Sequence, residues 1–366
     1  MSSQGGALSF PGMGEHRGPH RLFIGTYTRR ASLGIYAASL DRATGALGMP
    51  ELAAEAPNPT FLALSPDRRF LYAVCACDGW ASSFRVDPAG PRLVPVQQAP
   101  AGAGPTPCHI AVDASGRIAV AANYHLGQAA AIPLEADGTL GTPRVVSHAG
   151  RGPHPTRQAA AHVHSANFSP DGRFAIVCDL GLDRIYTYTI DRDAVALAPL
   201  SAPFVTAAPG AGPRHFAFGP DGRRGYAINE LDSTITAYDY AAPNGGLVPR
   251  RSVSLLPQGY RGDATAAEIR FHPNGRFAYG SVRGPDTLAV LAVDRASGDL
   301  SPVEVVPCGG RGPRSFSISP DGAWLVCAHQ DSDSLCVFRV DGATGRLERV
   351  PGTVPMSMPV CVLFLE

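Results

Sequence analysis

The apolar runs HFAF (residues 215–218) and GYAIN (225–229) flank the turn Gly219-Pro220-Asp221-Gly222-Arg223. Proline presets φ for a turn, aspartate is tolerated at the next position and glycine takes positive φ, so this stretch predicts a β-hairpin. Similar turns between short apolar runs begin at Ser65, Asp113, Ser169, His272 and Ser319. They recur at roughly 50-residue intervals, so the chain contains an internal repeat.

Each repeat continues beyond its hairpin. A third apolar run follows, such as RIYTYTI (184–190) or LAVLAV (288–293). A second turn, for example DRASGDL at 294–300, leads to a fourth and more polar run. Four antiparallel strands in a unit of this length are typical of a β-propeller blade.

Six repeats are complete and the seventh is split between the two ends of the chain. RLFIGTY (21–27), GIYAASLDRATGAL (34–47) and MPELAAEA (49–56) supply three of its strands, and PVCVLFL (359–365) supplies the innermost one. Pairing the last strand with the first three closes the ring and removes open sheet edges. We therefore predict an all-β, seven-bladed β-propeller as a single domain over residues 21–366, preceded by a flexible tail of residues 1–20.

Composition excludes several classes of protein. The chain has 366 residues, with 31 Lys+Arg and 31 Asp+Glu, and this balance does not favour a nucleic-acid-binding surface. It has no run of 18 apolar residues, so no membrane span is expected, and the first 20 residues do not resemble a signal peptide.

The eight cysteines are sparse, and several lie inside apolar strand runs. This pattern favours buried free thiols in a cytoplasmic protein over disulfides. Cys75 and Cys77 form a C-x-C without a second pair at zinc-binding spacing, so we expect no metal there.

The repeat also predicts where a site lies. In each blade the innermost strand begins, and the second strand ends, on the face opposite the Pro-Asp-Gly turns. One ring of equivalent positions there holds Thr60, Cys108, His164, Arg214, Ala267 and Arg314. A second ring holds Ala76, Tyr124, Leu180, Glu230, Arg283 and Gln330. Charged residues converging on a rigid scaffold, with arginines that can grip a carboxylate or phosphate by two hydrogen bonds, favour a site for a small anion.

Several stretches resemble a known family. They are GPRHFAFGPDG from Gly212, NELDS from Asn229, HSANFSPDGR from His164, the DLGLDR run from Asp179, and GTYT from Gly25. Together they resemble the bacterial 6-phosphogluconolactonases of the seven-bladed propeller type, a fold family that includes fungal 3-carboxy-cis,cis-muconate cyclase. The resemblance extends from about Arg21 to Leu365. One departure is SVRGP at 281–285, where the family often has Ser-Asn-Arg-Gly-His.

The resemblance implies a lactone site formed by His164, Arg214, Glu230 and Arg283, the same four residues that the repeat register brings to the mouth. The predicted substrate-binding residues are His162, His215, Asn229, Arg314, Gln330 and Asp179. In hydrolysis of a small anionic sugar lactone, Glu230 or His164 would activate water, and the arginines would bind the anion and stabilise the oxyanion. We expect no cofactor and a monomer or weak homo-oligomer.

Three alternatives remain open from the sequence. A muconate-type cycloisomerase needs nearly the same residues, with a proton moved to or from carbon. A propeller can also act as a non-catalytic interaction scaffold. In a metal-dependent lactonase, oxygen ligands would come from Glu230, Asn229, Asn123 and Asp179, although the neighbouring arginines would repel a cation.

Overall fold

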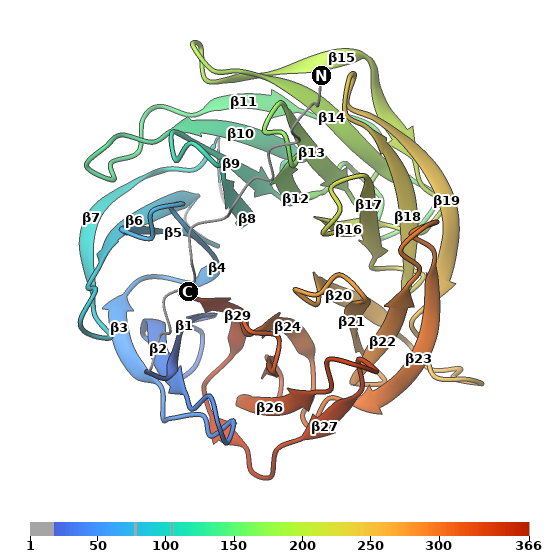
Figure 1. The fold of residues 1–366 in the computed structure, drawn as a ribbon. Coiled ribbons are helices and arrows are strands. Elements are labelled where there is room, and N and C mark those ends of the chain that lie inside the picture. The colour runs from blue at the N-terminus through green and yellow to red at the C-terminus, as the bar shows by residue number, and fades with distance from the viewer. Residues whose placement is uncertain (1–17, 77–78, 103, 105, 366) are drawn as a thin grey trace, which may run out of the picture.

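The computed structural model describes residues 18–76, 79–102, 104 and 106–365. These residues form seven antiparallel sheets arranged in a ring (Figure 1), which confirms the predicted seven-bladed propeller. Within these ranges no helix is long and apolar enough to cross a membrane. Most of the predicted tail, residues 1–17, lies outside the described residues, as does Cys77.

Each blade runs from the axis outward in four strand positions. The innermost strands are β29 (Pro359–Phe364), β4 (Pro59–Leu64), β8 (Pro107–Val112), β12 (Val163–Phe168), β16 (Pro213–Phe218), β20 (Thr265–Phe271) and β24 (Pro313–Ile318). The second strands are β1 (His20–Thr26), β5 (Phe70–Cys75), β9 (Ile118–Asn123), β13 (Phe174–Asp179), β17 (Arg224–Asn229), β21 (Phe277–Arg283) and β25 (Trp324–His329).

In the outer half of each blade, the third strand is mostly buried and the outermost strand is the most exposed. The third strands are β2 (Gly34–Leu40), β6 (Trp80–Val86), β10 (Gln128–Pro133), β14 (Arg184–Asp191), β18 (Thr234–Ala241), β22 (Thr287–Val293) and β26 (Ser334–Val340). The outermost are β3 (Glu51–Glu55), β7 (Leu93–Pro100), β11 (Arg144–Ser147), β15 (Ala196–Thr206), β19 (Gly246–Ser254), β23 (Leu300–Pro307) and the broken pair β27 (Leu347–Arg349) and β28 (Val354–Pro355).

The ring closes through the split blade, as the sequence predicted. β29 pairs antiparallel with β1, so the first and last strands of the chain share one sheet (Figure 1). Side chains reinforce the contact with the preceding blade. The indole Nε1 of Trp324 donates to the carbonyl of Arg42 at 3.1 Å, and His20 Nε2 lies 2.7 Å from Asp321 Oδ2.

The Pro-Asp-Gly turns form as the residue types dictate. Ser169 Oγ donates to Asp171 Oδ1 at 2.6 Å and accepts from the backbone N–H of Phe174 at 3.0 Å, which ties the turn to the second strand. Gly172 takes a φ of 66° in the left-handed region that glycine favours. In the first such turn, Arg68 occupies the equivalent conformation with a φ of 60°.

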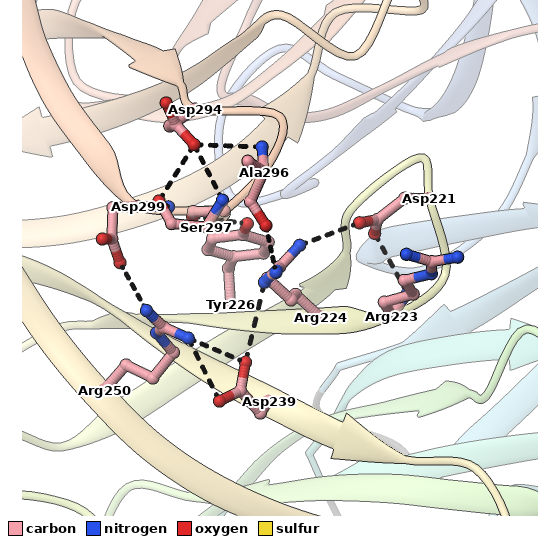
Figure 2. A network of polar contacts seen from close by, with 11 residues as sticks. Asp221, Arg223, Arg224, Tyr226, Asp239, Arg250, Asp294, Ala296, Ser297 and Asp299 are labelled. Carbon is pink, nitrogen blue, oxygen red and sulfur yellow. Dashed lines mark hydrogen bonds and ion pairs between the residues drawn. The ribbon is translucent and has the colours of Figure 1, made fainter.

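The face that carries these turns is joined by contacts between blades (Figure 2). Arg224 in β17 pairs with Asp221 of its own turn at 3.1 Å and donates to the carbonyl of Ala296 in the next blade at 2.7 Å. Arg250 bridges Asp239 and Asp299, each at 3.2 Å. These charges serve the packing of blade on blade.

Between the blades the core is apolar. Tyr226 and Ile228 of β17 pack with Ile269 of β20 and Leu291 of β22 in one buried cluster. All seven described cysteines are free thiols, and only Cys108 among them is not fully buried.

Candidate active site

The innermost strands are irregular at the positions where the sequence predicted a site. The pairing register shifts around His164 in β12, Arg214 in β16 and Arg314 in β24, so each is the extra residue of a β-bulge. A bulge re-aims the side chain of its extra residue. The ring of His164 lies 5.2 Å from that of His215, to which Arg214 donates, and the charges of Arg214 and Arg314 both lower the pKa of His164.

Glu230 directly follows β17 and is the carboxylate of the site. Its Oε2 accepts a hydrogen bond from Arg214 Nε at 2.9 Å and lies 3.2 Å from a guanidinium nitrogen of Arg283, and its Oε1 pairs with Arg157. Burial raises the pKa of Glu230, but the charges of Arg283, Arg214 and Arg157 outweigh it and hold the pKa far below its usual range. Glu230 is therefore ionised at neutral pH.

Arg214 is only 2% exposed and is surrounded by protein groups. Besides Glu230, it donates through Nη1 to the carbonyl of Ala267 and to Nε2 of His215, the latter at 3.0 Å. Burial and the charge of Arg314 lower its pKa to about 9, so the guanidinium remains protonated at neutral pH.

Arg157, in the connection between β11 and β12, is a site residue that the sequence did not predict. The next residue, Gln158, is fully buried and anchors this loop by donating to Leu180 O at 2.8 Å and to Asp183 Oδ1 at 2.7 Å. The same Asp183 oxygen accepts from the N–H of Gly212 at 2.7 Å, just before Arg214. One buried aspartate therefore positions both arginine-bearing segments.

His164 is the neutral member of the cluster. Its ring is buried, and Nδ1 has no hydrogen-bond partner among the described residues. Burial, with the nearby charge of Arg214, lowers the pKa of His164 well below its usual value. The ring is therefore uncharged at neutral pH and available to accept a proton.

Aromatic rings border His164. Tyr124 occupies the position in its blade that Glu230 occupies in its own, and its ring meets that of His164 edge-on at 5.6 Å. His162 stacks on Tyr124 with ring centroids 4.3 Å apart and places Nδ1 2.9 Å from the Tyr124 carbonyl. His162 thus supports one wall of the mouth.

Arg283, Arg314 and Gln330 are the more accessible predicted residues. The side chain of Arg283 is 19% exposed and donates to the carbonyl of Ala266 at 3.2 Å. The half-buried guanidinium of Arg314 lies 5.8 Å from the ring centroid of Tyr27, and no hydrogen bond or ion pair joins it to another described residue. Gln330 donates to its neighbour Asp331 at 3.3 Å.

Three other predicted residues face protein partners. The amide of Asn229 donates to Thr234 and Thr236, both in β18, at 2.9 Å each. Asp179 accepts from the N–H of His162 at 2.8 Å and holds His148 Nδ1 at 2.7 Å. Their positions in the repeat predicted the right end of the blade, but their side chains turn into the sheet and the preceding loop.

The third such residue is His215, whose ring nitrogens are both engaged. Nε2 faces Arg214, and Nδ1 lies 3.1 Å from Oε1 of Glu268, a buried carboxylate that the sequence analysis had not included in the site. Glu268 lies in the wider bulge of β20, where the register shifts between Ala266 and Ile269.

A pocket of about 510 Å³ adjoins the cluster at Arg283. It is lined by polar groups that include Asp232, Ser233, Asp263 and Thr265. Across the described part of the chain, no group of three or more His, Cys, Asp or Glu side chains is arranged to hold a metal ion.

The fold and this cluster define a class of protein: a seven-bladed propeller whose mouth gathers arginines around one carboxylate, beside a neutral histidine. Residues 21–364 match the family described as "Lactonase, 7-bladed beta-propeller". The chain belongs to this family and is a lactonase.

Individual relatives of the chain are also named as lactonases. The 6-phosphogluconolactonase of Bacillus subtilis is 36% identical over 94% of this chain and 98% of its own length. That of Formosa agariphila is 31% identical over 90% and 95%. The solved periplasmic gluconolactonase of Pseudomonas aeruginosa superposes with a TM-score of 0.91 at 34% identity, over 95% of this chain and 99% of that one. The chain is thus similar to lactonases of both phosphorylated and unphosphorylated sugar acids.

Proposed function

We propose that the protein hydrolyses the lactone of a phosphorylated sugar acid, of the 6-phosphogluconolactone type, with His164 as the general base. The observation that carries this proposal is the balance of charge at the mouth. Arg157, Arg214 and Arg283 share the single carboxylate of Glu230, while Arg314 has no carboxylate partner among the described residues. Such a cluster has unbalanced positive charge, which an anionic substrate would neutralise.

The chemistry needs only water and the residues present. His164 takes a proton from water as the water oxygen bonds to the lactone carbonyl carbon, which forms a tetrahedral oxyanion. When this intermediate collapses, the bond to the ring oxygen breaks and that oxygen receives the proton from His164. The product is an open hydroxy acid, whose carboxyl group releases a proton to solvent.

The arginines stabilise the oxyanion and bind the phosphate. Arg283 and Arg157, whose side chains are 19% and 37% exposed, are accessible enough to stabilise the oxyanion. One well-placed donor contributes about 3–4 kcal/mol to such a step. Arg314 binds the remote phosphate, because its charge is not already paired.

Glu230 acts as an ionised organiser in this scheme. Both oxygens of Glu230 are already paired with Arg157, Arg214 and Arg283, whereas Nδ1 of His164 has no hydrogen-bond partner among the described residues. The two oxygens of Glu230 instead orient the guanidinium groups around the reacting carbonyl.

We propose a cytoplasmic location, since a phosphorylated substrate does not cross a bilayer unaided. The seven described cysteines, all free, agree with a reducing compartment. We propose a monomer or a weak homo-oligomer, because the ring closes on itself without a partner strand.

The test compares 6-phosphogluconolactone with glucono-1,5-lactone in a pH-stat assay with EDTA present, after subtraction of spontaneous hydrolysis. The wild type is expected to hydrolyse the phosphorylated lactone with the higher kcat/KM, and His164→Gln to lose at least 100-fold in kcat. Arg314→Gln should raise KM about 10-fold for the phosphorylated lactone only.

Arg311→Gln is the matched control, because Arg311 is exposed and lies three residues before Arg314, in the connection into β24. Equal kcat/KM on both lactones, unchanged in Arg314→Gln, would refute a phosphate site at Arg314. Full activity in His164→Gln would refute its role as the base.

A further inference from the structure

A buried chain of polar groups runs from Arg214 in β16 to Glu268 in β20. Arg214 Nη1 donates to His215 Nε2 at 3.0 Å, and His215 Nδ1 lies 3.1 Å from Glu268 Oε1. None of the three residues is more than 5% exposed. The chain therefore passes through protein.

The chemistry of arginine determines the tautomer of His215. A guanidinium nitrogen can only donate, so Nε2 must present its lone pair to Arg214. In the neutral ring the proton is then on Nδ1, from which it is donated to Glu268. Burial and the charge of Arg214 lower the pKa of His215 to about 4, so the ring is neutral at neutral pH.

Glu268 is fixed from several sides. Its Oε1 accepts the N–H of Ile269 at 3.0 Å, and Arg270 lies 3.4 Å from Oε2. Burial raises the pKa of Glu268, but Arg270 and His215 outweigh it and lower the pKa to about 2. The carboxylate therefore remains an acceptor at neutral pH.

The bulge of β20 constrains Arg214 in two ways, one direct and one through His215. Ala267 offers its carbonyl to Nη1, and the adjacent Glu268 acts on the same nitrogen through His215. Glu230 cannot fix Arg214 alone, because it is shared with Arg157 and Arg283. A second set of contacts is therefore needed to fix the plane of the Arg214 guanidinium.

We infer that His215 and Glu268 are positioning residues, which orient Arg214 and, through it, the carboxylate of Glu230. This inference rests on the proposed function, in which Glu230 organises the arginines around the carbonyl. In this role they act through Arg214 and need no contact with the substrate. Through His215, Glu268 in β20 fixes the orientation of Arg214 in the neighbouring blade.

Glu268→Met removes the acceptor, and Glu268→Gln restores one, because the glutamine carbonyl accepts from Nδ1–H. We expect Glu268→Met to lose at least 10-fold in kcat with KM changed less than 3-fold, and Glu268→Gln to stay within 3-fold of wild type. Glu304→Gln, an acid on the outer strand β23, is the matched control. Wild-type kcat in a folded Glu268→Met, or equal losses in Met and Gln variants, would overturn the inference.

A second measurement does not depend on activity or on a variant of Glu268. Long-range ¹H–¹⁵N spectra of the wild type, with the signals of His215 assigned from His215→Gln, are expected to show a neutral ring protonated at Nδ1 at pH 7. An Nε2–H tautomer or an imidazolium would overturn the inference even if Glu268→Met fails to fold. If the spectra agree but no lactone is hydrolysed, the proposed function fails while the Arg214–His215–Glu268 geometry stands.

Discussion

Arg157 and Glu230 lie 73 positions apart in the sequence and form an ion pair at the mouth of the propeller. Arg157 comes from the connection into β12, and Glu230 ends the hairpin of the next blade. The pair ties the loop between β11 and β12 to the carboxylate of Glu230. It also limits how the loop can move without leaving Glu230 partly unpaired.

Replacing Arg157 is expected to impair hydrolysis. Arg157→Ala removes a donor near the reacting carbonyl, so kcat/KM should fall by about 10- to 100-fold, within what one charged donor contributes. Arg157→Lys keeps the charge but not the planar fork, and should recover only part of the loss. Steady-state rates on the lactone check this, with exposed Arg151→Ala on the same loop as the control. Wild-type rates in Arg157→Ala would remove Arg157 from the site.

The sequence could place His164, Arg214, Glu230 and Arg283 at one mouth, but it did not indicate that Arg157 lies there too. The four occupy repeat positions, and the bulges and strand ends at those positions place side chains at one mouth in blade after blade. Arg157 lies in a connection whose length differs from the others, so no register applies to it. Its only signal was a positive charge in a long loop.

The direction of a side chain is the other feature that the repeat pattern could not predict. Asn229 and Asp179 precede ring positions, as predicted, yet partners on β18 and on the loop before β12 turn them away from the mouth. His215 was predicted to bind substrate, but its neighbours engage both nitrogens. Such partners come from other parts of the fold, and the repeat pattern contains no information about them.

The pH profile tests the environment of His164. Because its pKa lies well below the usual 6.5, the ring stays neutral and kcat/KM should be flat from pH 8 to below 6.5, with the acidic limb at lower pH. Arg314 contributes to the lowered pKa, so Arg314→Gln should move the limb to higher pH. Initial rates between pH 4.5 and 8 measure this, with Arg311→Gln as the control. A limb near 6.5 in the wild type would contradict the lowered pKa.

Stability should fall at mildly acidic pH for a related reason. His109, His164 and His215 are buried with pKa values below that of the unfolded chain, and that of His215 is about 4. Below pH 6.5 the unfolded state binds protons that the folded state excludes. The stability present above pH 6.5 is therefore lost as the pH falls toward 4, by up to about 1.4 kcal/mol per pH unit for each histidine.

Thermal melts between pH 7.5 and 5 measure this loss. His109→Phe should reduce the slope, since the ring of His109 packs on that of Phe61 with centroids 4.1 Å apart and a tilt of 31°, and a phenyl ring keeps that packing without titrating. A melting temperature independent of pH over this range would contradict the prediction, as would an unchanged slope in His109→Phe.

The first hairpin turn offers a stabilising substitution. Arg68 has a φ of 60° and an exposed side chain, at the position where the five other turns have glycine. A left-handed conformation costs a non-glycine residue about 1–2 kcal/mol, which glycine avoids. Glycine also makes the unfolded chain more flexible, and this lowers the free energy of unfolding by about 0.5–1 kcal/mol. Arg68→Gly should therefore raise the free energy of unfolding by about 0.5–1 kcal/mol.

Urea denaturation of Arg68→Gly measures this gain, and Gly222→Ala is the reciprocal control. Gly222 has a φ of 66°, and an added Cβ would lie 3.3 Å from Pro170 of the preceding blade, so this substitution should lose about 1 kcal/mol. Opposite signs in the two variants would show that backbone strain in the turn determines the difference. A loss of stability in Arg68→Gly would mean instead that the unfolded-state entropy of glycine outweighs the strain at this turn.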